Sequence, residues 1–239
     1  SVDVELQGDF VAAYTQGDNR SVVATDTCKN TVYAIAKDDP FDTIESFGLS
    51  LASHFIRQYS QVAQATIRLQ ERRWKRLLSC SHAFTGSDGE FATAEVVATQ
   101  GEARSVSAGL QGLLLAKTTQ SGFADFHQDE YCTLTDTQDR IFSTELEATW
   151  TYQDTEMDFV QARRAIRSAL LARFVDHFSR SVQETLLLMG QAALEACPGI
   201  HSITLNMPNK HHLLVNLEPL GRENANEIFA PTDEPFGWI

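Results

Sequence analysis

Four short patches of the chain carry side chains that can bind a small ligand or move a proton. An imidazole is the most frequent general acid or base in enzymes. Guanidinium and carboxamide groups are planar and hold polar ligands through paired hydrogen bonds. The patches are Thr25-Asp26, Phe123 with Arg140, Val182-Gln183 and Asn209-Lys210-His211.

The first patch opens an apolar-periodic run in the stretch VATDTCKNTVYAIAKD, residues 23–38. The simplest interpretation is helix capping, because Thr25 and Asp26 can accept hydrogen bonds from the free N–H groups of a first turn. Several β-branched residues in the same stretch are also typical of strands. The apolar positions at helical spacing are Cys28, Val32, Ile35 and Ala36.

The other patches also have ordinary structural explanations. Arg140 can form a surface ion pair with Asp139 or Glu145. Gln183 can be an exposed residue in the first turn of a helix, and Asn209 can be a plain turn residue. Taken singly, these explanations are favoured over catalysis, because few residues of any chain are catalytic.

Familiar catalytic motifs are absent from the sequence. It has no GxGxxG, GxxxxGK[ST], GxSxG or HExxH, so dinucleotide, P-loop, serine-hydrolase and zinc-protease functions lack a signature. The stretch FHQDEY holds His127, Asp129 and Glu130, but neighbouring residues point to different faces of a strand or helix. We therefore predict no metal site.

Composition narrows the class of protein. The 239 residues carry a net charge of −13, which argues against a nucleic-acid binder. No apolar run is long enough to cross a bilayer, and the stretch SVDVELQGDF lacks the pattern of a signal peptide. The four cysteines are scattered without a CxxC, which indicates free thiols in a reducing compartment. We expect an acidic, cytoplasmic protein that binds neither nucleic acid nor membrane.

Periodicity predicts a first round of strands and helices before residue 101. A strand with period-two alternation starts at Val2 and continues towards Tyr14, and a second occupies residues 61–74. A further strand pair is expected around the turn Gly86–Gly89. The apolar positions that predict a helix after Pro40 are Phe41, Ile44, Phe47, Leu51 and Phe55.

A second round follows. Strands are predicted over residues 103–119 and 140–152. The chain is then expected to close with a β-hairpin over residues 200–217 that turns at Pro208-Asn209. Between them, apolar spacing predicts two helices, one with Phe159, Ala162, Ile166, Leu170 and Phe174, the other with Val182, Leu186, Met189, Ala193 and Ala196.

The same order of elements thus occurs twice, which predicts an internally duplicated α+β protein. Each unit would be an antiparallel β-sheet with a pair of helices on one face. The boundary falls between units 1–100 and 101–239. Duplication also favours helix for residues 23–38, because they occupy the place of the first helix in the second round.

Three long stretches resemble the urate oxidase (uricase) family, especially its bacterial branch. They are GDNRSVVATDTCKNTVYAIAKD, DEYCTLTDTQDRIFSTELEATW and LNMPNKHHLLVNLEP, and the resemblance extends over essentially the whole chain. It implies two tandem tunnelling-fold (T-fold) units, with the first strand of the first unit missing. It also implies a homotetramer whose active sites lie at subunit interfaces.

The resemblance assigns roles to the four patches. The family's purine clamp falls on Phe123, Arg140, Val182, Gln183 and Asn209, with Thr25 and Asp26 supplied by a neighbouring subunit. Phe123 would stack on the purine, while Arg140 and Gln183 would bind its polar edges. Thr25 and His211 would act in proton transfer, and Asn209 would hold dioxygen or water.

The implied reaction converts urate, dioxygen and water into 5-hydroxyisourate and hydrogen peroxide. No cofactor or metal is expected, because the electron-rich purine anion supplies the electrons. Eukaryotic members are peroxisomal, but the ending FGWI is no peroxisomal signal, so we expect a cytoplasmic, bacterial location.

The chain departs from the family pattern at several places: the family's C-terminal tail is missing, and Gln128 stands where the family often has a basic residue. The family's relay lysine comes from a strand that would precede residue 1, and no lysine precedes Lys29, so we expect an incomplete proton relay. The chain would then be either a truncated form of an active enzyme or an enzyme that is impaired as it stands. The family also has a glycine where Asp125 stands. Two alternatives stay open: a non-catalytic purine-binding scaffold, and a pterin-type T-fold enzyme, which would commonly have a buried Glu where Gln183 stands.

Overall fold

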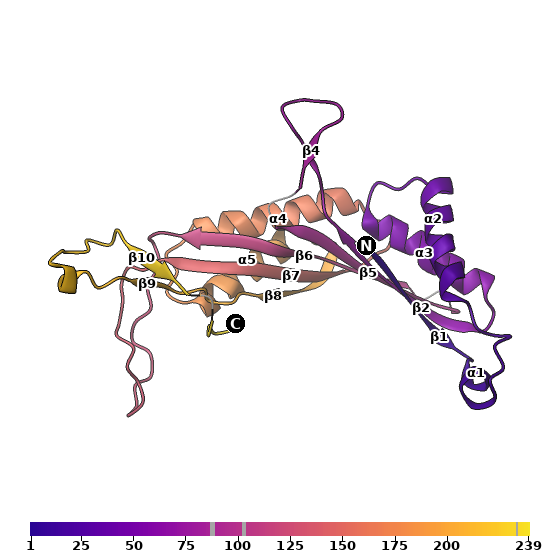
Figure 1. Ribbon diagram of the computed structural model, residues 1–239, viewed down its shortest axis with the longest axis horizontal. Helices are drawn as coiled ribbons and strands as arrows, with labels where there is room; N and C mark the ends of the chain where they lie inside the picture. The colour runs from indigo at the N-terminus through magenta and orange to yellow at the C-terminus, as the bar shows by residue number, and fades with distance from the viewer. Residues whose placement is uncertain (87–88, 102–103, 233) are drawn as a thin grey trace.

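A single antiparallel sheet forms the frame of the molecule (Figure 1). The computed structural model describes residues 1–86, 89–101, 104–232 and 234–239. The sheet has six strands in the order β1-β2-β5-β6-β7-β8. These strands are β1 (Val2–Gly8), β2 (Val62–Glu71), β5 (Phe91–Thr99), β6 (Arg104–Lys117), β7 (Phe142–Tyr152) and β8 (Ile200–Asn206).

Two pairs of helices accompany the sheet, as the duplication predicts. Ser181, like Asp158 and Thr43, caps its helix by accepting a hydrogen bond from a backbone N–H of the first turn. The region predicted as an ambiguous helix is helical, so this prediction is confirmed. The helices are α2 (Thr25–Asp38) and α3 (Ile44–Gln58) in the first half, and α4 (Phe159–Val175) and α5 (Val182–Ala196) in the second.

Short elements lie outside the main sheet. Figure 1 shows the hairpin β3–β4, the β6–β7 connection and the β9–β10 region standing out from the body. The short elements are α1 (Val11–Gln16), β3 (Lys75–Arg76), β4 (Phe84–Thr85), β9 (His212–Leu214), η1 (Glu218–Leu220) and β10 (Phe229–Pro231). No helix of the described residues is long and apolar enough to cross a membrane.

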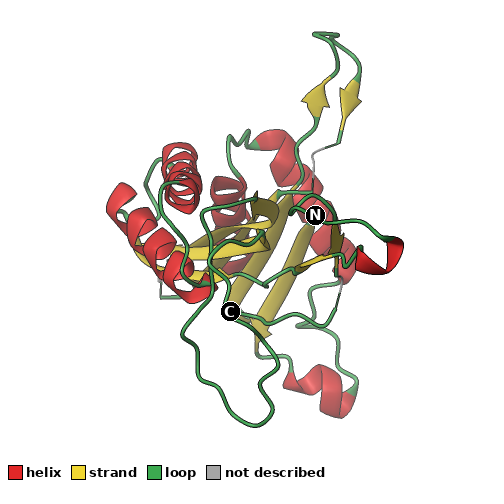
Figure 2. Cartoon of the chain, turned by 90° about the vertical axis from the view of Figure 1, so that its left-hand side faces the viewer, coloured by secondary structure: helices red, strands yellow, loops and turns green. Residues whose placement is uncertain are grey.

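The core lies between one face of the sheet and the helices (Figure 2). Alternate strand residues face it: Ile67 is paired with Val96, and Val96 with Val106, and all three are buried. Gly48 allows α3 to approach closely, because a Cβ there would lie 2.7 Å from Cγ2 of Val96. The period-two pattern of the strands therefore determines which face the helices cover.

The opposite face of the sheet carries exposed ion pairs. Arg68 on β2 donates to Glu5 on β1 at 2.9 Å and to Glu95 on β5 at 2.7 Å. These cross-strand pairs are half exposed, so solvent screens them and each contributes little to stability.

A buried ion pair connects the two halves on the helical face. Nη2 of Arg163 on α4 donates to both carboxylate oxygens of Glu45 on α3 at 2.6 Å. Glu45 is fully buried, and Arg163 also donates to Glu71 at 3.2 Å. The Tyr152 hydroxyl donates to Glu45 at 3.3 Å, and burial followed by the charge of Glu45 raises the pKa of that phenol. The carboxylate is thus neutralised only when Arg163 on α4 reaches Glu45 on α3.

The predicted α+β class with helix pairs on one face of an antiparallel sheet is confirmed. The sheet continues through the expected unit boundary, because β5 pairs directly with β6. The division into units 1–100 and 101–239 stays a prediction.

The predicted course of the first strand is wrong beyond Gly8. Residues 11–16 form helix α1 rather than a strand continuing towards Tyr14. The partner strand β2 begins at Val62, opposite Gly8, so nothing further along could pair with a longer β1.

Two predicted hairpins are also wrong. Strand β4 pairs with β3 rather than with β5 across the Gly86–Gly89 turn. In the described chain β9 pairs with β10 rather than with β8. Backbone groups after β8 are taken by other segments: Met207 N–H donates to Ile239 O at 2.9 Å, and Lys210 N–H to Ser143 O at 2.9 Å. Long-range partners decided these pairings, which local alternation does not reveal.

Removing Arg163 would leave the Glu45 carboxylate buried without its main partner. We expect Arg163→Met to lower the free energy of unfolding by about 3 kcal/mol or more. Arg68→Met removes a half-exposed arginine from β2 of the sheet and should cost less than about 1 kcal/mol. Urea denaturation of both variants measures the difference. Equal losses of unfolding free energy in the two variants would show that the buried ion pair stabilises the protein no more than the exposed pairs do.

Candidate functional site

One cavity gathers most of the residues that the sequence singled out. Its volume is about 360 Å³. Its walls come from the β6–β7 connection, the start of α5, the segment after β8 and the C-terminal residues. The predicted residues that line it are Phe123, Arg140, Val182, Gln183, Asn209 and His211.

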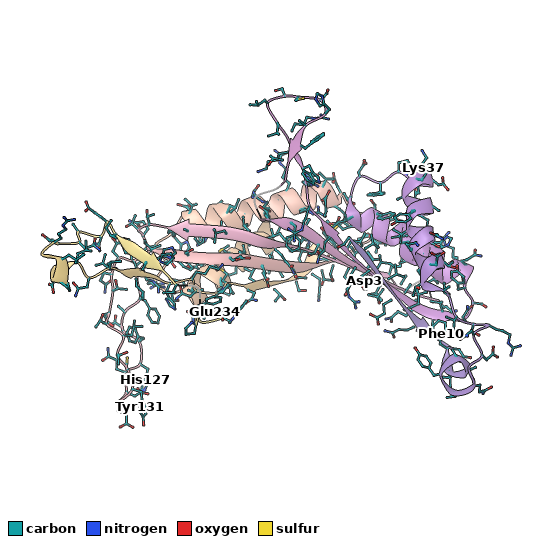
Figure 3. The ribbon with its side chains drawn as sticks, in the orientation of Figure 1. Asp3, Phe10, Lys37, His127, Tyr131 and Glu234 are labelled. Atoms are coloured by element: carbon teal, nitrogen blue, oxygen red, sulfur yellow. The ribbon has the colours of Figure 1, made fainter. Side chains whose placement is uncertain are left out.

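Backbone bonds at the base of the β6–β7 connection bring Phe123 and Arg140 together. Phe123 N–H donates to Thr137 O at 2.7 Å, and Thr137 N–H donates back at 2.9 Å. Arg140 N–H donates to Ser121 O at 2.9 Å. The remainder of the connection extends away from the body, with His127 and Tyr131 near its tip (Figure 3). Within the described residues no cluster of acidic, His or Cys side chains can hold a metal ion.

Arg140 is a desolvated cation. Its Cζ lies 5.4 Å from the centre of the Phe123 ring and 5.9 Å from that of Phe142. Its Nε is buried without a hydrogen-bond partner. Burial lowers the pKa of the guanidinium. A partly buried positive charge with an unused donor favours an anionic ligand.

The ion pairs suggested for Arg140 do not form among the described residues. Glu145 accepts from Lys210 at 2.6 Å, and Asp139 accepts from the Thr119 hydroxyl at 2.8 Å. Both carboxylates therefore have other partners, and no described carboxylate neutralises the guanidinium.

Helix α5 directs its N-terminus at the cavity. Val182 and Gln183 are its first two residues, and the N–H groups of a first turn have no acceptor within their helix. The helix dipole adds partial positive charge there. Gln183 is exposed, as expected for an ordinary residue in the first turn of a helix, yet it also lines the cavity.

Asn209 and His211 are held by the C-terminal part of the chain. Asn209 N–H donates to Gly237 O, and Thr232 N–H donates to His211 O, both at 2.9 Å. Asn209 is therefore more than a plain turn residue, because its backbone is fixed beside the cavity.

Thr25 and Asp26 are not brought to this cavity. They are exposed in the first turn of α2, on the other half of the molecule. The capping interpretation is wrong, because the N-cap residue is Ala24 and no side chain caps the helix. Asp26 instead accepts from Lys29 at 2.7 Å and from Asn30 at 2.9 Å. Their assignment to a neighbouring subunit stays a prediction.

Sequence reasoning missed several lining residues. Only His212 carried a signal, since it stands beside His211 in the KHH stretch. The others are apolar or small residues whose place depends on folding over long distances. The additional lining residues are Leu134, Thr135, Thr137, Ile141, His212, Leu213, Gly237 and Ile239.

The fold defines an antiparallel α+β protein whose cavity places a cation beside an aromatic ring and a helix N-terminus. A sequence profile named Uricase matches residues 4–103 and 106–239. A uricase of Arthrobacter globiformis is 42% identical over 239 residues, covering 100% of this chain and 78% of that protein. A uricase of Dictyostelium discoideum is 37% identical, covering 99% of this chain and 84% of that protein. The chain therefore belongs to the uricase family.

Solved structures agree with this membership. The crystal structure of uricase from Arthrobacter globiformis matches with a TM-score of 0.96 at 42% identity, covering 100% of this chain and 83% of that one. Urate oxidase from Bacillus sp. TB-90 matches with a TM-score of 0.87 at 25% identity, covering 100% and 84%. The T-fold architecture expected from the resemblance is thus confirmed.

Asp125 has an unfavourable backbone conformation next to the site. Its φ is 57°, in the left-handed region that favours glycine, the residue expected there from the family. It precedes Phe126, whose ring stacks on Phe123 at 4.9 Å.

We expect Asp125→Gly to raise the free energy of unfolding by about 0.5–1 kcal/mol, because glycine relieves the left-handed strain. Asp125→Ala keeps the Cβ and should give no gain. Thermal unfolding of both variants tests this. A gain in the alanine variant would point to the carboxylate instead.

Proposed function

We propose that this chain binds urate in the cavity beside Arg140 and oxidises it with dioxygen. The observation that carries the proposal is the partly buried guanidinium, whose Nε is an unused donor and which lies beside an aromatic ring and a helix N-terminus. Urate at neutral pH is a flat anion with carbonyl groups next to ring nitrogens. Its shape and charge complement this set of groups.

Each group matches one feature of urate. The Arg140 guanidinium can donate two charge-assisted hydrogen bonds to one edge, which a lysine cannot do in the same geometry. The Gln183 carboxamide offers one donor and one acceptor to the adjacent edge. Phe123 offers a stacking surface, worth about 0.5–1.5 kcal/mol beyond burial on the scale of aromatic pairs. The N–H groups of α5 favour the negative charge.

The reaction would take place above the ring of the bound anion. Asn209 would hold dioxygen or water there, and His211, with Thr25 of a neighbouring subunit, would move protons. Urate loses two electrons, dioxygen gains them, and water adds to the purine to give 5-hydroxyisourate and hydrogen peroxide. The protein supplies orientation and a desolvated, positively charged site.

A homotetramer would complete the site. Thr25 and Asp26 are exposed at the far half of the chain, so they can reach a cavity only in another copy. Tyr33, on the same helix, is an exposed large hydrophobic residue that such an interface would cover. A reducing compartment such as the cytoplasm fits the four free thiols.

Arg140→Ala tests the clamp. We expect it to weaken urate binding by about a hundredfold or more, because two charge-assisted hydrogen bonds are lost. Calorimetry without oxygen measures binding separately from turnover. Arg57→Ala removes an exposed arginine on α3 that does not line the cavity and should bind like the wild type.

If Arg140→Ala bound urate as tightly as the wild type does, the proposed role of Arg140 in binding would be ruled out. Oxygen uptake with peroxide release then measures catalysis. Tight binding without turnover would identify the non-catalytic scaffold instead.

Mixing two inactive variants tests the shared site. Subunits with Thr25→Ala and subunits with Arg140→Ala, unfolded and refolded together, should recover up to about a quarter of wild-type activity, because some sites combine two intact halves. Each variant refolded alone is the control. No recovery, in a mixture shown by light scattering to contain tetramers, would place Thr25 outside the neighbouring subunit's site.

A further inference from the structure

A buried polar cluster lies behind the clamp without lining the cavity. It consists of Lys117, His177, Ser179 and Thr185, and we call it the backing cluster. Ser179 and Thr185 are fully buried, and their hydroxyl oxygens lie 2.5 Å apart. Buried polar groups that are fully paired fix local geometry, since any displacement leaves one of them unsatisfied.

Ser179 joins the two sides of the clamp through its backbone. Its N–H donates to Gln120 O at 2.9 Å, and Gly122 N–H donates to Ser179 O at 2.8 Å. Gln120 has a φ of 60°, a left-handed conformation that these bonds help to hold. The segment before α5 is thereby attached to the residues that immediately precede Phe123.

Thr185 ties the first turn of α5 to the same place. Its backbone N–H donates to Ser181 O at 3.2 Å, and the Ser181 hydroxyl caps the helix by accepting from Glu184 N–H at 3.1 Å. Val182 and Gln183 lie between these residues. The Thr185 hydroxyl joins this turn to Ser179, whose hydroxyl oxygen lies 2.5 Å away, and so holds the α5 N-terminus against the segment that precedes it.

His177 completes the cluster as a hydrogen-bond acceptor. Its Nδ1 lies 2.7 Å from Arg173 O, which only accepts, so Nδ1 carries the proton. Its Nε2, 3.0 Å from Oγ1 of Thr185, then accepts from that hydroxyl. Lys117 donates to His177 O at 2.6 Å. Burial lowers the pKa of His177, which keeps the ring neutral as this arrangement requires.

We propose that Thr185 and Ser179 are positioning residues for the substrate, holding the α5 N-terminus and the Phe123 segment at the spacing that urate requires. The inference rests on the proposed function, because it concerns the same site. Neither side chain lines the cavity, so both act through Val182, Gln183 and Phe123.

Thr185→Val keeps the shape of the side chain and removes its hydroxyl. We expect urate binding without oxygen to weaken about tenfold, as loss of one buried hydrogen bond predicts. KM for urate should rise similarly while kcat stays within about twofold, because the chemical groups are untouched. Thr185→Ser, which restores the hydroxyl, should bind like the wild type.

Thr144→Val is the matched control. Thr144 on β7 is equally buried, but its hydroxyl has no partner among the described residues, so this change should leave binding unaltered. If Thr185→Val does not fold, Ser179→Ala replaces it with the same expected loss. Thermal unfolding shows whether each variant is folded at the assay temperature.

The outcomes separate the two proposals. Wild-type binding by Thr185→Val, with binding lost in Arg140→Ala, overturns the positioning role and leaves the proposed function standing. A loss in Thr185→Ser or Thr144→Val as large as that in Thr185→Val also overturns it. Failure of the wild-type chain to bind urate overturns both proposals.

Discussion

The apolar face of the six-stranded sheet must be covered along its length, and this constraint decides where everything else lies. Helices from both halves pack on this same face of the sheet. There the Glu45 carboxylate, buried on α3, finds its main counter-charge in Arg163 on α4. An unpaired buried charge is costly, so this pair discriminates against arrangements in which the two helix pairs separate. The start of α5 is held beside the β6–β7 connection by backbone hydrogen bonds of the segment that precedes it.

The candidate site uses this frame to hold a charge that water would otherwise solvate. Arg140 is kept among aromatic rings, with a donor left unused, and the N-terminus of α5 adds positive potential. The chain has an overall charge of −13, so the cavity is a local exception rather than part of a basic surface. An acidic exterior with a desolvated cation inside suits a small anion and disfavours extended polyanions.

Much of the fold was predictable because it is locally encoded. The helix with Phe159, Ile166 and Phe174 has one apolar stripe and an N-cap, and it forms as α4. Strand β9 shows the limit. Leu213 alternates like a strand residue, but whether it pairs with β8 or β10 depends on where the C-terminal segment folds back, which no local pattern contains. The register and the partner of a strand depend on tertiary contacts rather than on the local sequence.

The sequence by itself determined the four long helices, most strands of the main sheet and the types of side chain available to the site, because periodicity and chemical character belong to the residues themselves. It also indicated the family through three long stretches. Only the tertiary structure decided that Phe123, Arg140, Gln183 and Asn209 share one cavity while Thr25 does not. Convergence of distant side chains depends on backbone bonds between segments far apart in the chain, such as Ser179 with Gly122 and Asn209 with Gly237.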